Sequence, residues 1–227
     1  MASRHAAPDT LQFPARRLRS VYQRLLDHHG PQGWWPGETP FEIMVGAVLT
    51  QNTAWINVES AIANLINADA LEPARILAVA EQQLAEWLRP SGYFNIKAKR
   101  LRNFCHWYVE AGEYHRLIRK DTQTLRHDLL AVNGIGPETA DDMLLYAFKR
   151  PVFVIDAYTR RLFTRLKIID GDENYEILRR AFEQALGSDV ALFNEFHALI
   201  VAHAKDICRI KPRCADCVLR KQCPSEV

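Results

Sequence analysis

The 227-residue chain has no long hydrophobic run and no large excess of charge of one sign. No stretch of about 18 apolar residues occurs, which excludes a membrane-spanning helix. The N-terminal residues lack the roughly 7–15-residue apolar core of a secretory signal, so we expect a cytoplasmic protein. With 48% hydrophobic and 25% charged residues, the composition excludes collagen-like and wholly disordered chains. The net charge of +2 alone neither indicates nor excludes a nucleic-acid partner.

Strand patterns are also scarce. The β-branched run at 151–156 has only the length of a connector, whereas apolar residues recur at helical spacing through most of the chain. Gly30 and Pro31 end the first predicted helix, and residues 41–49 are apolar enough to form a buried helix. Further helices are predicted from 52 or 53 to about 65 and near 72–88, 95–111, 123–131, 137–148, 157–167, 172–186 and 189–204. The sequence therefore predicts an all-α protein.

Cysteine is concentrated at the C-terminal end, where four of the five cysteines are spaced as Cys208-x5-Cys214-x2-Cys217-x5-Cys223. In a reducing compartment this pattern favours a metal site over disulfides. Four thiolates bind either a structural zinc ion or a [4Fe–4S] cluster. Only Cys214 and Cys217 form a two-residue knuckle, and zinc sites usually pair two knuckles, so the spacing favours the cluster. The fifth cysteine, Cys105, is predicted to be a buried apolar residue.

Two basic runs stand out. One lies between Lys205 and Lys221, where six cations accompany two acidic residues, and the other occupies residues 97–102. Such runs are usually solvated helix faces, and they indicate DNA binding only together with other features.

Residues 130–140 join two predicted helices through a Gly-x-Gly turn. The glycines can adopt positive φ and leave backbone N–H groups accessible. Pro137 suits the first turn of the next helix, whose N-terminal amides favour an anion, and Ile135 is expected to anchor the turn in the core. The pattern is typical of a helix–hairpin–helix that holds a DNA phosphate without reading sequence. Its candidate DNA contacts are Asn133, Gly134, Ile135, Gly136 and Thr139.

Asp156 follows the apolar run 152–155 and precedes a predicted helix. Any helix favours aspartate as its N-cap residue. Alternatively, Asp156 is a catalytic carboxylate whose charge the helix N-terminus stabilises. Its place after the hairpin and before the cysteines favours the catalytic interpretation, and the two roles are compatible.

Together these features resemble the endonuclease III superfamily of DNA glycosylases. The resemblance is carried by the hairpin GIGPETA, the Asp156 segment, the C-terminal cysteines and the segment Gly92–Ala98. It implies an all-α, two-lobed helix–hairpin–helix DNA glycosylase fold. A six-helix barrel would span 41–152, and residues 1–40 with 153–227 would form an iron–sulfur lobe. It also implies a base-excision-repair enzyme on duplex DNA, with a [4Fe–4S] cluster held by the four cysteines.

Two differences from the bifunctional members of this superfamily narrow the predicted activity. Where bifunctional members of the family carry a Schiff-base lysine, this chain has Glu138, so AP lyase activity should be weak or absent. Asp156 and Glu138 are thus the candidate catalytic residues. The segments WWP (34–36), LTQNT (49–53) and RPSG (89–92) resemble the 3-methyladenine DNA glycosylase III subgroup, although its best-known members lack the cluster. We therefore expect a monofunctional glycosylase for alkylated purines.

An alkylated purine carries positive charge and leaves easily, so its pocket needs chiefly aromatic faces. The candidate pocket residues are Trp34, Trp35, Pro36, Trp55 and Lys205. Paired tryptophans can equally be core residues, and Lys205 can equally contact phosphate. Either Gln51 or Asn52 could fill the space that a flipped nucleotide leaves. Other expected DNA contacts are Lys97, Arg209, Arg220 and Lys221, whereas His197 and His203 are expected to be structural or solvent-facing.

Several alternatives stay open. The same scaffold could serve a mismatch thymine/uracil or adenine glycosylase, or an endonuclease III-type glycosylase/AP lyase that uses the amine of Lys97 or Lys205. A catalytically inactive DNA-binding module is a further possibility, and a zinc-ribbon regulator fits the sequence least. We expect a monomer that acts on nucleoid DNA in a bacterial cytoplasm.

Overall fold

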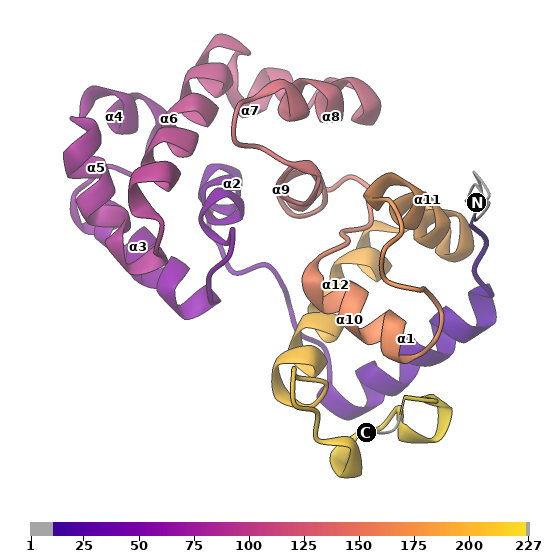
Figure 1. Cartoon of the computed structure of the whole chain (residues 1–227). Helices are drawn as coiled ribbons and strands as arrows, with labels where there is room; N and C mark the ends of the chain where they lie inside the picture. Colours follow the sequence, from indigo (N-terminus) through magenta and orange to yellow (C-terminus); the bar gives the residue numbers. More distant parts are fainter. Residues whose placement is uncertain (1–10, 226–227) are drawn as a thin grey trace, which may run out of the picture. The chain divides into compact units, whose positions relative to one another are not determined.

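The computed structural model describes residues 11–225, and within this range the chain is helical and contains no strand (Figure 1). The prediction of an all-α protein is confirmed. Residues 1–10, which belong to the segment examined for a secretory signal, and residues 226–227 lie outside the described range. No helix within the described range is long and apolar enough to cross a membrane.

The chain divides into two compact units. One consists of the residues up to Trp34 together with those from Pro151 onward, and the other is the continuous segment Trp35–Arg150. The boundaries expected from the family resemblance fall at residues 41 and 153.

In the Trp35–Arg150 unit, α2 (Pro40–Leu49) is the central helix. Residues 43–49 are all buried, as expected for a helix that is apolar on every side. The helix packs against α3 (Trp55–Asn67), α6 (Phe94–Glu110) and α9 (Pro137–Asp142). The other helices of this unit are α4 (Pro73–Ala78), α5 (Glu81–Leu88), α7 (Glu113–Leu117) and α8 (Thr122–Ala131).

Two helix predictions need correction. The single helix expected at 72–88 is two helices, α4 and α5, because the chain turns at Val79 and Ala80 with extended backbone angles. Arg102 Nη1 donates hydrogen bonds to the carbonyl oxygens of Ile76 (3.2 Å) and Val79 (2.8 Å) at this break. The helix expected at 137–148 ends as α-helix at Asp142 and continues as a π-helical turn, Met143–Ala147.

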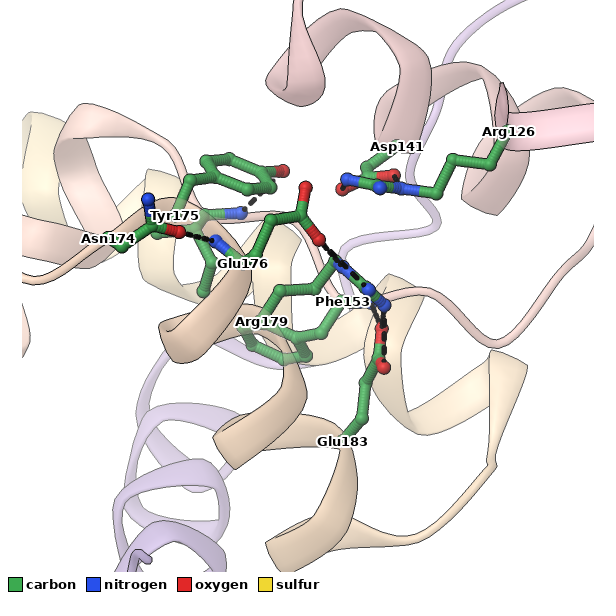
Figure 2. A network of polar contacts seen from close by, with 9 residues as sticks. Arg126, Asp141, Phe153, Asn174, Tyr175, Glu176, Arg179 and Glu183 are labelled. Carbon is green, nitrogen blue, oxygen red and sulfur yellow. Dashed lines mark hydrogen bonds and ion pairs between the residues drawn. The ribbon is translucent and has the colours of Figure 1, made fainter. Parts of the chain in front are cut away.

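A buried ion pair joins α8 to α9 (Figure 2). Arg126 Nε and Nη2 donate to the two carboxylate oxygens of Asp141 at 2.6 and 3.1 Å. The Asp141 side chain is fully buried and that of Arg126 is 13% exposed. Because this contact is bidentate and charge-assisted, it fixes the geometry of the two helices that flank the hairpin.

In the other unit, α12 (Val190–Asp206) is largely buried and packs against α1 (Ala15–His29) and α10 (Ala157–Arg165). Helix α11 (Tyr175–Leu186) packs against α1. Arg179 of α11 pairs with Glu176 and Glu183, as Figure 2 shows. The C-terminal segment contains two short 3-10 turns, Cys214–Asp216 and Arg220–Gln222.

Candidate active site

The predicted hairpin lies between α8 and α9. Gly134 adopts φ +100°, a conformation that favours glycine, and Gly136 is the N-cap residue of α9. Ile135 is 5% exposed and anchors the turn in the core, as the sequence predicts. Exposed side chains of this segment belong to Asn133, Pro137 and Glu138.

Gln51 is hydrogen-bonded to the hairpin. Its Nε2 donates to Gly134 O at 3.1 Å and to Thr139 Oγ1 at 3.0 Å, and its Oε1 accepts a hydrogen bond from Arg100. The neighbouring Asn52 is exposed and has φ +55°, which asparagine tolerates better than most residues. Of the two alternatives for filling the space of a flipped nucleotide, only Asn52 presents an exposed side chain.

Lys97 is not the DNA contact that its basic run indicated. The residue is 1% exposed, and its Nζ donates to the carbonyl oxygens of Leu49 (2.8 Å) and Ser91 (2.7 Å). Burial, followed by the charge of Arg100, lowers the pKa of Lys97 to about 8. The sequence-based prediction is wrong because position 97 lies on the buried face of α6, beside Ala98.

Asp156 is the N-cap residue of α10. Its Oδ1 accepts a hydrogen bond from the Thr159 backbone N–H at 2.6 Å, and its Oδ2 lies 3.5 Å from Nε2 of His197 on α12. Asp156 is 8% exposed and His197 is 4% exposed. One oxygen therefore caps the helix, while the other faces an imidazole.

The environment of Asp156 favours its charged form. Burial raises the pKa of its carboxyl, but the His197 contact and the Thr159 N–H hydrogen bond more than offset burial, so the pKa lies below its ordinary value. Asp156 is therefore ionised at neutral pH. Sequence reasoning did not find His197 as its partner, because no short motif connects residues on two separate helices.

Trp35, Trp55 and Tyr146 form an aromatic cluster. The ring centroid of Trp35 lies 5.0 Å from that of Trp55 and 4.9 Å from that of Tyr146. Gly46 of α2 lies directly against both indoles, since a Cβ there would be 3.3 Å from Trp35 Nε1 and 3.4 Å from Trp55. Trp55 Nε1 donates to Glu59 Oε1 at 2.7 Å. The two indoles are thus held in fixed orientations.

The other candidate pocket and DNA-contact residues lie nearer the surface. Trp34 is half-buried. The exposed ones are Pro36, Lys205, Arg209, Arg220 and Lys221.

The four C-terminal cysteines line one pocket of about 430 Å³, a volume that includes its part open to solvent. All four are free thiols. Arg165 Nη1 lies 3.2 Å from Cys208 Sγ, and His203 Nε2 lies 3.4 Å from Cys217 Sγ. His203 itself is fully buried, in line with a structural role. Burial raises the pKa of the Cys217 thiol, and the other three cysteines raise it further.

The four cysteines line the same pocket, and the guanidinium of Arg165 lies beside the Cys208 sulfur, where it would offset the charge of a thiolate. Apolar residues complete the lining, namely Leu162, Leu166, Ile207 and Leu219. Within residues 11–225, no three His, Cys, Asp or Glu side chains lie close enough together to hold one metal ion.

Known proteins match almost the whole chain. The family model of the HhH-GPD superfamily base excision DNA repair proteins matches residues 45–187. A Methanocaldococcus jannaschii protein designated a candidate DNA repair glycosylase is 48% identical over 212 residues, which is 92% of this chain and 96% of the relative. Escherichia coli endonuclease III is 24% identical over 92% of this chain and 95% of its own length.

Solved structures confirm the predicted fold. The H. pylori 3-methyladenine DNA glycosylase (MagIII), bound to 1,N6-ethenoadenine, is 33% identical with a TM-score of 0.69, over 84% of this chain and 95% of that chain. An endonuclease III–DNA complex, 19% identical, has a TM-score of 0.80 over 93% and 95% of the two chains and shares the fold. The protein therefore belongs to the HhH-GPD superfamily of base-excision-repair DNA glycosylases.

Proposed function

We propose that this protein is a monofunctional glycosylase that removes alkylated, 3-methyladenine-like purines from duplex DNA by hydrolysing the N-glycosidic bond. The observation that carries the proposal is the environment of Asp156, a buried carboxylate at a helix N-terminus with one oxygen beside His197. The 33% identity to a 3-methyladenine DNA glycosylase supports the substrate class.

Asp156 suits a reaction in which the leaving base needs little help. A purine alkylated at N3 or N7 already carries positive charge and departs with the electron pair of the glycosidic bond. The sugar then becomes cationic, and a fixed, ionised carboxylate stabilises that charge. The same carboxylate can orient the attacking water, whose oxygen bonds to the sugar carbon and whose proton passes to Asp156 or to solvent.

The aromatic cluster supplies electron-rich faces for a cationic base. Attraction between a cation and an indole contributes roughly 0.5–2 kcal/mol, most where water is excluded. Trp35 and Trp55 are held in place by Gly46 and Glu59, so their faces are pre-organised for binding. We also propose Trp34, Pro36 and Lys205 as residues that contact the damaged base.

We propose that the DNA contacts come from the hairpin and from the basic run between Lys205 and Lys221. The backbone of residues 133–136 would hold one phosphate, and the exposed Arg209, Arg220 and Lys221 would contact others. Thr139, which the sequence also predicts as a DNA contact, is left out of this set because it is 5% exposed and its Oγ1 accepts a hydrogen bond from Gln51. Asn52 is the better candidate for the space of the flipped nucleotide, because the Gln51 amide is already bonded to the hairpin. We propose that the protein acts as a monomer on chromosomal DNA in the cytoplasm.

Borohydride should trap no covalent adduct between this protein and abasic DNA. Glu138 cannot form an imine, and Lys97, one of the alternative amines, is buried and bonded to two carbonyl oxygens. Gel electrophoresis after reduction measures the adduct, with an endonuclease III reaction as the positive control. Lys205 is exposed, so an adduct that Lys205→Ala removes would contradict the monofunctional proposal.

We also propose that Cys208, Cys214, Cys217 and Cys223, as thiolates, would hold a [4Fe–4S] cluster. When bound, the cluster would order the C-terminal segment that carries Arg209 and Arg220. Purified protein should be brown and absorb at about 400 nm. Iron analysis of Cys217→Ser should show loss of iron, whereas Cys105→Ser, which changes a buried cysteine outside this pocket, should retain it. Zinc in place of iron in the native protein would refute the cluster.

The substrate class is tested by single-turnover excision from duplexes that each contain one defined lesion. One duplex contains 7-methylguanine, and the others contain a U·G, a T·G or an A·8-oxoguanine mismatch. A neutral base needs more hydrogen-bond partners and leaving-group activation than a cationic purine, so we expect excision of 7-methylguanine and little of the neutral bases. Faster excision from a mismatch would favour the alternative, a mismatch or adenine glycosylase.

A further inference from the structure

Lys97 occupies an unusual place for a lysine. An ammonium group is costly to bury unless it is well hydrogen-bonded, and here both of its acceptors are backbone carbonyl oxygens, at 2.7 and 2.8 Å. Neither acceptor lies on its own helix, α6. The side chain therefore joins two other parts of the chain.

The two carbonyls mark the points from which two surface loops leave the core. Leu49 is the last residue of α2 and leads directly into residues 50–53, which include the exposed Asn52. Ser91 ends a short 3-10 turn and leads into Tyr93, which is 67% exposed with φ +46°. An exposed aromatic residue on a positive-φ backbone is uncommon, so this loop is held in a specific conformation.

The same side of α6 also holds the hairpin. Arg100, three residues after Lys97, donates a hydrogen bond to Gln51. It also packs against the hairpin, because a Cβ added to Gly134 would lie only 2.3 Å from Arg100 Cγ. Asn103, three residues further on, donates from Nδ2 to Asn133 O at 3.1 Å. Residues three apart on a helix share a face, so one stripe of α6 contacts all three loops.

We propose that Lys97 is a positioning residue, which ties residues 50–53 to the Ser91–Tyr93 turn so that the two loops meet duplex DNA as one preformed surface. The proposal rests on the proposed function, because it assumes that these loops contact a duplex. Lys97 itself touches no DNA, and it acts only through the loops that its Nζ joins.

The test compares Lys97→Met with Arg102→Leu in the full-length protein. Arg102 is a matched control because it lies on the same helix and also donates to two backbone carbonyls, but those belong to the α4–α5 break. The measurement is the affinity for a duplex containing a tetrahydrofuran abasic analogue. Lys97→Met should weaken binding by on the order of 10–10²-fold, whereas Arg102→Leu should leave affinity nearly unchanged even if it lowers the melting temperature.

A second comparison, made in a variant that lacks the proposed loop contacts, separates a positioning role of Lys97 from general destabilisation. In a protein that already carries Asn52→Ala and Tyr93→Ala, Lys97→Met should cost little further affinity, because the loops no longer make the contacts that it aligns. An undiminished cost, or equal effects of Lys97→Met and Arg102→Leu, would overturn the inference. Failure of the wild-type protein to bind the duplex would instead refute the proposed function.

Hydrogen exchange of the wild-type protein keeps the inference falsifiable if no variant at position 97 folds. Amides of residues 50–53 and 91–93 should become protected together when the abasic-analogue duplex is added. Protection of one loop without the other would show that they do not act as a unit.

Discussion

Replacing Asp156 with asparagine should lower single-turnover excision of an alkylated purine by about 10²–10³-fold and leave duplex affinity nearly unchanged. Asparagine is as good an N-cap residue as aspartate, so α10 should keep its first turn and the protein its stability. What the change removes is the negative charge that, in the proposed function, stabilises the cationic sugar. Because the pKa of Asp156 lies below its ordinary value, the wild-type rate should show no acidic limb from this group between about pH 5 and 7.

Asp189→Asn provides the matched control. Asp189 is the N-cap residue of α12 and accepts a hydrogen bond from the Leu192 N–H at 3.0 Å, but it is exposed. If the loss of excision came from disturbing a helix cap, both variants would lose activity. Full activity in Asp156→Asn would contradict the assignment of the catalytic carboxylate and would favour an inactive DNA-binding module or a different catalytic group.

Replacing Arg126 with methionine should destabilise the protein by about 3–5 kcal/mol. Asp141 is fully buried and makes a bidentate contact with Arg126, so the change removes the guanidinium from a buried ion pair. Removing one partner of a buried ion pair costs this much because the remaining charge keeps its desolvation penalty. Thermal or urea unfolding measures the loss.

Two comparisons check the physical reason for this loss. The double variant Arg126→Met/Asp141→Leu should recover part of the stability, since it replaces both charges with apolar groups. Lys120→Met breaks the partly exposed Lys120–Asp128 pair and should cost no more than about 1 kcal/mol. Equal losses for Arg126→Met and Lys120→Met would show that burial of Asp141 has little energetic effect.

Sequence reasoning succeeded where a short pattern carries the physics. The Gly-x-Gly turn and the proline after it depend on neighbouring residues, and the predicted hairpin is present. The four C-terminal cysteines line one pocket, whereas the cluster that their spacing favours stays a prediction. The buried helix α2 was equally predictable from its continuous apolar run. The order of these motifs along the chain also predicted the family to which the protein belongs.

Contacts between distant segments were not predictable in the same way. Lys97 reads as one of four cations in a basic run, yet its burial depends on carbonyl groups 48 and 6 residues away. His197 faces Asp156 from another helix. At the break between α4 and α5, the carbonyl oxygen of Val79 accepts a hydrogen bond from Arg102 of α6. In each case, tertiary packing determines which side of a helix turns inward, and local composition does not report it.

The most direct test of the central claim is base release from duplex DNA treated with a simple methylating agent, with the freed bases separated by chromatography. The account predicts release of 3-methyladenine or 7-methylguanine, with strand breaks only after alkali treatment. Intact DNA with no released base would contradict the alkylpurine assignment, and strand breaks without alkali would contradict hydrolysis by a monofunctional enzyme.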